Sequence, residues 1–144
     1  MSELSLDPED WLPHRPPFLL IDTLLAIEPG VRASALWTLT GDEWFFPGHF
    51  PGRPTTPGVL LIESIAQCGA VIVLSDDRYT GRLPLFGGVE RARFRRQIVP
   101  GDTVRIECEM TKFSARGGKG FGTATVEGDL AASTELFFVL AEVT

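Results

Sequence analysis

Alternating apolar and polar positions form the clearest pattern in the chain, and they run from residue 104 to residue 111. Apolar side chains occupy the even positions, from Val104 to Met110, and polar side chains occupy the odd positions, from Arg105 to Thr111. Successive side chains of a strand point to opposite faces, so this alternation predicts a strand with one buried face.

Five further segments have the β-rich or alternating composition of strands, and turn residues separate them. These segments are 18–28, 31–40, 83–98, 119–127 and 130–143. We expect Gly87 and Gly88 to disturb the strand at 83–98, because glycine inside a strand often marks a bulge. A short helix is expected after Asp7, with Pro8 at its first position.

The segment 57–75 is apolar nearly all round and predicts the one long helix of the chain. Pro57 suits the first helical position because its missing N–H would lack a partner there, and Thr56 is an acceptable N-cap. Glu63 and Gln67 lie in the middle of the run, which favours a buried helix over a membrane span.

One long helix among about six antiparallel strands predicts the α+β class. A sheet wrapped around a single central helix would bury the apolar surface of that helix. The chain has 144 residues, which fits one domain with a sizeable core, and we assign residues 1–144 to it.

Composition and charge narrow the class of protein further. The chain is 44% hydrophobic and 22% charged, as is ordinary for soluble globular proteins, and its net charge of -6 argues against general nucleic-acid binding. Cys68 and Cys108 lack CxxC spacing, so we expect free buried thiols and no metal site. The acidic N-terminus does not resemble a signal peptide, so we expect a cytoplasmic protein.

A rigid loop precedes the long helix and carries a histidine. Residues 48–58 contain three prolines, three glycines and His49. Prolines fix φ, so the loop is expected to be stiff and to aim the His49 side chain. The reference pKa of histidine lies near neutrality, which suits a general base. A histidine beside the free N–H groups of a helix start, followed by the Glu63 carboxyl, provides the parts for proton abstraction next to a carbonyl.

Glu63 has no cationic residue three or four positions away, so burial would leave its carboxylate unpaired. That cost favours the protonated form, which can donate a proton. The alternative is an acid at the helix edge that faces solvent or an interface. Gln67 follows at i+4 on the same face, where it could hydrogen-bond the carboxyl or satisfy nearby backbone groups.

Two further positions have a structural and a functional interpretation. The N–H of Gly58 lies at the positive end of the helix dipole and could polarise a carbonyl oxygen, or Gly58 could simply allow close packing. His14 lies in a proline-rich corner, and we interpret it as a residue that braces the fold.

A cluster of cations occurs in this acidic chain at Arg91, Arg93, Arg95 and Arg96. These side chains could form a solvated strand face paired with Glu90 or Glu107. They could equally dock an acidic partner that carries a phosphate group, because the guanidinium fork suits phosphate.

A longer pattern surrounds these residues. It reads Phe46-Pro47-Gly48-His49-Phe50-Pro51-Gly52-Arg53-Pro54, then Pro57-Gly58-Val59, Glu63 and Ala66-Gln67, with further matching segments at 12–22, 92–96, 99–102 and 118–124 and at Glu135. With this spacing the chain closely resembles the FabZ-type 3-hydroxyacyl-acyl-carrier-protein dehydratases of bacterial fatty-acid synthesis. The resemblance extends over roughly residues 12 to 140 and is more specific than one short motif.

The resemblance implies the hot-dog fold and the dehydration of a 3-hydroxyacyl thioester to a trans-2-enoyl thioester. His49 would be the base, Glu63 the acid, and the Gly58 N–H the donor to the thioester oxygen. Leu85, beside Phe86, would form the gate of the substrate tunnel, where the family often has tyrosine. No metal or organic cofactor is implied, since the substrate carries phosphopantetheine from an acyl carrier protein.

Helix geometry and the resemblance both predict a site shared between subunits. Glu63 lies six residues past Pro57, about 9 Å along the helix axis. One chain would barely bring Glu63 to a substrate held at His49 and Gly58. The family pairs His from one subunit with Glu from its partner, so we expect a homodimer at least, and possibly a hexamer built as a trimer of dimers.

Two rival functions and one related reaction remain for this fold. A hot-dog thioesterase would need a water-activating carboxylate beside the thioester carbonyl, and the His49 motif weighs against it. A non-catalytic acyl-binding subunit of a lipid or polyketide pathway would not need His49 and Glu63. The related dehydratase–isomerases carry Asp where this chain has Glu63, and this difference argues against an isomerase reaction. Thr55-Thr56 replaces an aliphatic pair of the family, which bears on chain-length preference rather than on the chemistry.

Overall fold

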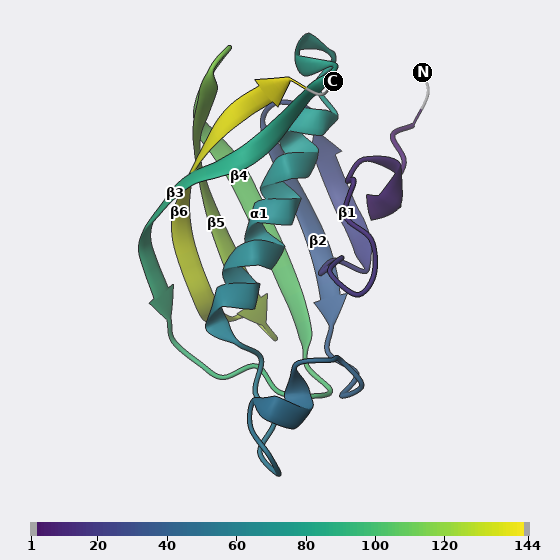
Figure 1. The fold of residues 1–144 in the computed structure, drawn as a ribbon, viewed down its shortest axis with the longest axis vertical. Helices are drawn as coiled ribbons and strands as arrows, with labels where there is room; N and C mark the ends of the chain where they lie inside the picture. Colours follow the sequence, from purple (N-terminus) through teal and green to yellow (C-terminus); the bar gives the residue numbers. More distant parts are fainter. Residues whose placement is uncertain (1–2, 143–144) are drawn as a thin grey trace.

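The computed structural model describes residues 3–142 and shows one antiparallel sheet around one long helix (Figure 1). The helix is α1 (Gly58–Leu74), and the described residues form six strands, in the sheet order β1-β2-β4-β5-β6-β3. The strands are β1 (Thr23–Glu28), β2 (Arg32–Thr38), β3 (Arg82–Phe94), β4 (Thr103–Ser114), β5 (Gly117–Val126) and β6 (Asp129–Glu142). The predicted α+β class and hot-dog fold are therefore confirmed.

The core lies between α1 and the concave face of the sheet. Ile65, Cys68 and Val71 of α1 are fully buried, and Val104 and Ile106 of β4 are equally buried opposite them. Full burial of one such aliphatic side chain stabilises the fold by about 1.5–3 kcal/mol. The alternation at 104–111 therefore predicts the buried face of β4 correctly, although Met110 is only partly buried.

Helix and sheet approach closely only because glycine lies at the contact points. A Cβ atom on Gly122 of β5 would clash with Ile65, and one on Gly69 of α1 would lie 3.2 Å from the Cys108 sulfur. An added Cβ at these distances would overpack the contact, so a residue larger than glycine would force the helix and the sheet apart.

The first predicted strand begins too early. The sequence predicts a strand from residue 18, but β1 begins at Thr23. Gln67 and Ser64 of α1 bond the preceding backbone: Leu20 N–H donates to Gln67 Oε1 at 2.9 Å, and the Ser64 hydroxyl donates to Leu20 O at 2.8 Å. With these groups occupied by helix side chains, Leu20 does not pair with β2, whereas Asp22 N–H, just before β1, already donates to Leu36 O at 2.8 Å.

The long edge strand β3 is irregular, as its glycines predict. Its pairing with β6 shifts between Phe86 and Gly88, and again between Glu90 and Arg93. The predicted extension to residue 98 is wrong, because β3 ends at Phe94. Ile98 instead turns its buried side chain into the core and accepts a hydrogen bond from Thr56 N at 2.8 Å.

The N-terminal end of α1 differs from the expected capping. Pro57 is the N-cap residue and Gly58 the first helical residue, and no side chain caps the helix. Thr56 is buried, and its hydroxyl has no hydrogen-bond partner among residues 3–142. Thr56 therefore does not act as the predicted N-cap.

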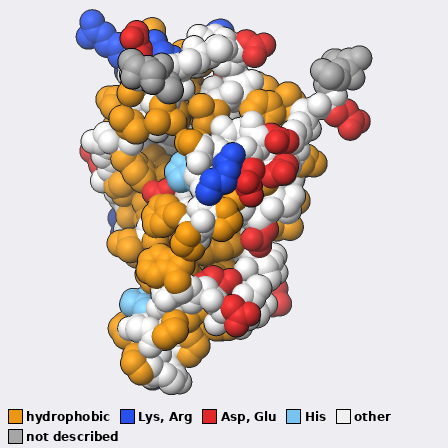
Figure 2. All heavy atoms as spheres, turned by 45° about the vertical axis from the view of Figure 1, so that its right-hand side comes forward, with side chains coloured by type: hydrophobic (Ala, Val, Ile, Leu, Met, Phe, Trp, Pro, Cys, Tyr) orange, Lys and Arg blue, Asp and Glu red, His pale blue; other side chains and the backbone are white. Residues whose placement is uncertain are grey.

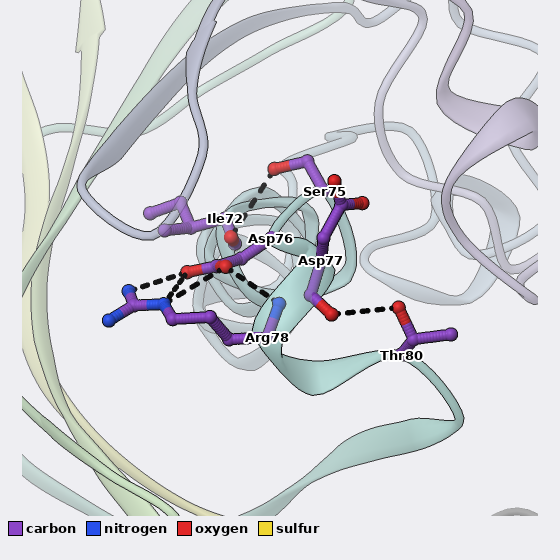
Figure 3. Close-up of polar contacts among 6 residues, drawn as sticks. All are labelled: Ile72, Ser75, Asp76, Asp77, Arg78 and Thr80. Carbon is purple, nitrogen blue, oxygen red and sulfur yellow. Dashed lines mark hydrogen bonds and ion pairs between the residues drawn. The ribbon is translucent and has the colours of Figure 1, made fainter.

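The C-terminal end of α1 is closed by polar contacts (Figure 3). The Ser75 hydroxyl donates to Ile72 O at 3.3 Å, and Gly30 N donates to the same carbonyl at 3.0 Å. Asp76 accepts hydrogen bonds from the Arg78 side chain, with Nη2 2.6 Å from Oδ2, and from the Arg78 backbone N–H at 3.0 Å. The hydrogen bonds from the Arg78 side chain lower the pKa of Asp76.

The short helix after Asp7 is confirmed as a 3-10 turn at Pro8–Asp10, and Cys68 and Cys108 are free and buried. The expected end of the last strand, Val143, lies outside the described residues.

Within 3–142, no helix combines the length and apolar character that a bilayer crossing needs. In the same range, no group of three or more acidic, histidine or cysteine side chains is placed to hold a metal ion.

Candidate active site

Hydrogen bonds fix the loop that carries His49. Phe50 and Arg53 exchange two backbone hydrogen bonds, and Thr55 N donates to His49 O at 2.9 Å. The His49 ring stacks on Phe50 with ring centroids 4.2 Å apart, and its Nδ1 lies 2.9 Å from Thr55 O. A carbonyl oxygen only accepts, so Nδ1 carries the hydrogen and Nε2 is left as a lone-pair acceptor.

Gly58 begins α1 beside this loop. No acceptor lies within hydrogen-bonding distance of its N–H among residues 3–142. A Cβ atom on Gly58 would lie 2.8 Å from the Phe94 ring, so the ring of β3 packs directly on the bare Cα. The interpretation that glycine permits close packing here is supported, and the free N–H at the positive end of the helix is available to an anion.

Glu63 lies on α1 at the mouth of a cavity of about 190 Å³. Its side chain is 20% exposed, and Oε2 accepts a hydrogen bond from Gln67 Nε2 at 3.0 Å. The same amide nitrogen donates to Phe18 O at 2.9 Å. Gln67 therefore does both things that the sequence left open: it holds the carboxyl and it satisfies backbone groups.

The cavity behind Glu63 is mostly apolar. It runs between α1 and the sheet, and among its lining residues are Gln67, Leu85, Phe86, Cys108 and Met110. The two residues expected at a gate, Leu85 and Phe86, are each 47% exposed and belong to this same cavity. An apolar cavity with one acid and one amide at its mouth suits an acyl chain with a polar head.

His14 is the residue that sequence reasoning missed. Its Nε2 lies 3.6 Å from Glu63 Oε2, and its side chain lines the same cavity. The expectation that Glu63 has no cationic neighbour holds along the helix, but His14 reaches it from the N-terminal segment. The proline-rich corner around His14 predicts a turn and does not indicate which helix that turn packs against.

His49 and Glu63 do not meet within one chain. Neither His49 nor Gly58 lines the cavity of Glu63, and Gly58 instead lines a separate hollow with Phe94 and Arg95. Figure 2 shows histidine side chains at two well-separated places on one face, with hydrophobic side chains between them. The structure thus brings together Glu63, Gln67 and the expected gate residues, and leaves both His49 and Gly58 outside their cavity.

The four arginines are not all equivalent. Arg91 pairs with Glu135 at 3.3 Å, and Arg96 lies 3.4 Å from Asp129 and 3.8 Å from Asp102. Neither partner is the Glu90 or Glu107 that the sequence suggests. Among the described residues, Arg93 and Arg95 form no ion pair, and both are exposed. Arg95 and Arg96 line the hollow beside Gly58.

A sheet around one central helix, with a loop histidine at the helix start and a carboxyl over an apolar cavity, is typical of hot-dog proteins that act on acyl thioesters. The model of the FabA-like domain family matches residues 12–135, and the chain belongs to this family.

Curated relatives agree over nearly the whole chain. The chain is 54% identical to the 3-hydroxyacyl-acyl-carrier-protein dehydratase FabZ of Moorella thermoacetica, over 91% of this chain and 92% of the relative. It is 53% identical to the FabZ of Desulforamulus reducens, with the same coverage of both chains. The FabZ of Herpetosiphon aurantiacus is 49% identical over 91% of this chain and 93% of its own length.

Solved structures share the fold at low sequence identity. A chain of the dehydratase heterocomplex ApeI:P from Xenorhabdus doucetiae superposes with a TM-score of 0.78 and 18% identity, over 96% of this chain and 93% of its own. A conserved protein of Pseudomonas aeruginosa gives a TM-score of 0.71 at 13% identity, over 92% and 98% of the two chains. At these identities the likeness supports the fold alone.

Proposed function

We propose that this protein dehydrates 3-hydroxyacyl thioesters, linked to acyl carrier protein, to trans-2-enoyl thioesters in fatty-acid biosynthesis. The observation that carries the proposal is the His49 ring: its Nδ1 is tied to Thr55 O, which leaves Nε2 as the free base in the loop that leads to Gly58 at the start of α1. The dehydratases named above, about half identical to this chain, support the same reaction.

Residues of this chain can carry out each step of the proposed reaction. His49 Nε2 takes the proton from the α-carbon, and the electron pair of that C–H bond becomes the new carbon–carbon double bond. The Gly58 N–H stabilises the negative charge that develops on the thioester oxygen. The carbon–oxygen bond at the β-carbon breaks as Glu63 protonates the departing hydroxyl, which leaves as water. The His49 proton then returns to Glu63 through solvent, and no step requires a metal or an organic cofactor.

A complete site requires two chains in this proposal, because His49 and Glu63 occupy separate places on one. The β3 strand supports a homodimer: it is an edge of the sheet and leaves Leu85, Phe86, Val89 and Phe94 45–51% exposed. An unpaired apolar edge is the kind of surface that a second copy covers about a two-fold axis. Each dimer would hold two mixed sites, with His49 from one subunit and Glu63 from the other, and three dimers could assemble into a hexamer.

The carrier protein would dock beside Gly58 in this proposal. The exposed guanidinium groups of Arg93 and Arg95 lack ion-pair partners among residues 3–142, so they suit an acidic surface and the phosphate of phosphopantetheine. Arg91 and Arg96 have acidic partners and would contribute less. Leu85 and Phe86 would gate the acyl cavity.

A hydratase assay tests the proposal and separates it from thioester hydrolysis. Enoyl thioester incubated with the protein should lose its conjugated absorbance as water adds, without release of free thiol. Free thiol released at a comparable rate would instead identify a thioesterase. A protein that binds acyl thioester but gives neither signal would be a non-catalytic acyl-binding subunit, and the proposal would be wrong.

A further inference from the structure

His14 has an environment that bracing of the fold does not explain. Its Nε2 faces Glu63 Oε2 at 3.6 Å, and its Nδ1 is buried without a hydrogen-bond partner among the described residues. A histidine that only braced the corner would be expected to use both ring nitrogens on the backbone around it. The nitrogen that faces a neighbour faces the proposed acid.

The segment around His14 is built to hold the ring in place. Arg15 Nη1 donates to both Leu12 O and His14 O at 2.7 Å, and its Nε pairs with Glu9 at 3.1 Å. Phe18 N donates to Arg15 O at 2.9 Å and closes the turn. The Arg15 guanidinium therefore ties the turn to the N-terminal segment and holds the backbone that carries the His14 side chain.

The unpartnered Nδ1 identifies the tautomer. A buried N–H without an acceptor costs more than a buried lone pair, because the donor loses a hydrogen bond to water that it cannot replace. The hydrogen of a neutral His14 ring therefore lies on Nε2, directed at Glu63. The distance of 3.6 Å exceeds hydrogen-bond length, and a small rotation of either side chain closes it, as happens when catalytic hydrogen bonds tighten with substrate.

Two donors then converge on one oxygen of Glu63. Gln67 Nε2 already donates to Oε2 at 3.0 Å, and His14 approaches the same atom. Among residues 3–142, Oε1 has no hydrogen-bond partner. We propose that His14 is a positioning residue: together with Gln67 it holds Oε2, so that the proton delivered to the leaving hydroxyl resides on Oε1 and faces the cavity. This inference rests on the proposed role of Glu63 as the acid.

Two variants of similar polarity test this geometry. The amide nitrogen of glutamine can reach the position of His14 Nε2, whereas that of asparagine reaches only the position of Nδ1, which has no partner to lose. His14→Asn should lower kcat by about 10- to 100-fold with little change in KM, as expected for a misplaced catalytic group. His14→Gln should retain most of the wild-type kcat.

A double-variant cycle shows whether His14 acts through Glu63. In the Glu63→Gln background, adding His14→Asn should lower the residual kcat no further, because the acid that His14 positions is already absent. Independent effects of the two substitutions on kcat would overturn the inference.

A spectroscopic measurement on the free protein does not depend on turnover. In ¹⁵N-histidine-labelled protein, the ring assigned to His14 should show the Nε2–H tautomer, and Glu63→Gln should shift its Nε2 resonance. An Nδ1–H tautomer, an unshifted resonance, or equal kcat for His14→Asn and His14→Gln would overturn the positioning role while leaving the proposed function intact. A wild-type protein without hydratase turnover would overturn both.

Discussion

The carbonyl oxygen of Thr55 accepts a hydrogen bond from Nδ1 of His49 across 2.9 Å, and this contact decides which ring nitrogen can act as a base. Thr55 is itself held, since its N–H donates to His49 O at 2.9 Å. The two residues thus hold each other across the turn at 50–53. The proposed base is oriented by the backbone of its own loop, and within residues 3–142 no carboxylate bonds to its ring.

Replacing His49 by alanine removes the proposed base. We expect His49→Ala to lower the rates of dehydration and of reverse hydration by at least about 100-fold, within the usual range for a positioned acid or base. The fold should persist, because His49 is only half-buried and its neighbours bond through their backbone. Turnover of enoyl thioester measures the rate and circular dichroism the fold. A folded variant with near-normal turnover would remove His49 from the mechanism.

Mixing two inactive variants tests the shared site. His49→Ala and Glu63→Gln homodimers should each be nearly inactive, because every site lacks one group. After subunit exchange, some heterodimers would combine an intact His49 with an intact Glu63, so partial activity should return. Exchange is checked by native mass spectrometry of the mixture. No recovery in spite of verified exchange, or a fully active monomer, would contradict a site built from two chains.

Gly58→Ala tests the close contact at the start of α1. The added Cβ would lie 2.8 Å from the Phe94 ring, and overpacking of this kind costs about 1–3 kcal/mol. We expect a lower free energy of unfolding in urea. We also expect a lower kcat, because relief of this contact would displace the Gly58 N–H from the position at which it is proposed to bind the thioester oxygen. Gly48→Ala is the matched control, since a Cβ there meets nothing within 4 Å. Adding Phe94→Leu to Gly58→Ala should restore part of the stability.

The Asp76–Arg78 pair at the end of α1 gives a prediction about pH. Arg78 lowers the pKa of Asp76 below its ordinary value of 3.8. The ionised carboxylate therefore stabilises the fold above pH 4, and this contribution is lost as pH falls through the lowered pKa. Asp76→Asn should reduce the loss of stability between neutral and acid pH, because the asparagine has no proton to gain.

Asp76→Ala separates the cap from the charge. Asparagine can still accept from the Arg78 backbone N–H, so Asp76→Asn keeps the cap of the 3-10 turn at Asp77–Tyr79. Alanine removes the cap as well and should cost about 1 kcal/mol more. Urea unfolding at several pH values measures both effects. Equal stability of the two variants at neutral pH would show that the cap contributes nothing.

Local patterns account for most of the fold that the sequence predicts. The alternation in β4 and the continuous apolar run of α1 depend on neighbours a few positions away, and both are read directly from the chain. The start of β1 is not, because Leu20 bonds to Gln67, 47 residues further on. The helix start was also wrong by one residue, since Thr56 is buried by packing that its capping propensity does not report.

The same distinction applies to the site. The motif around His49 and the i+4 spacing of Glu63 and Gln67 are local, and this spacing predicts the hydrogen bond between Gln67 and Glu63 as one of two alternatives. The sequence around His14 indicates only a role in the fold, because the approach of His14 to Glu63 is a contact between distant segments. A hydrophobic pattern carries no information on which polar side chains meet across such a contact.

Cys108 gives the wall of the proposed acyl cavity a chemical property as well as a shape. Its sulfur lines that cavity, and burial raises its pKa to about 12. An enoyl thioester is an electrophile to which thiolates add at the β-carbon, whereas protonated thiols are poor nucleophiles. At neutral pH this sulfur stays protonated. The conjugated product that we propose can therefore form beside a cysteine without alkylating it, and the apolar packing that excludes water there also protects the enzyme from its own product.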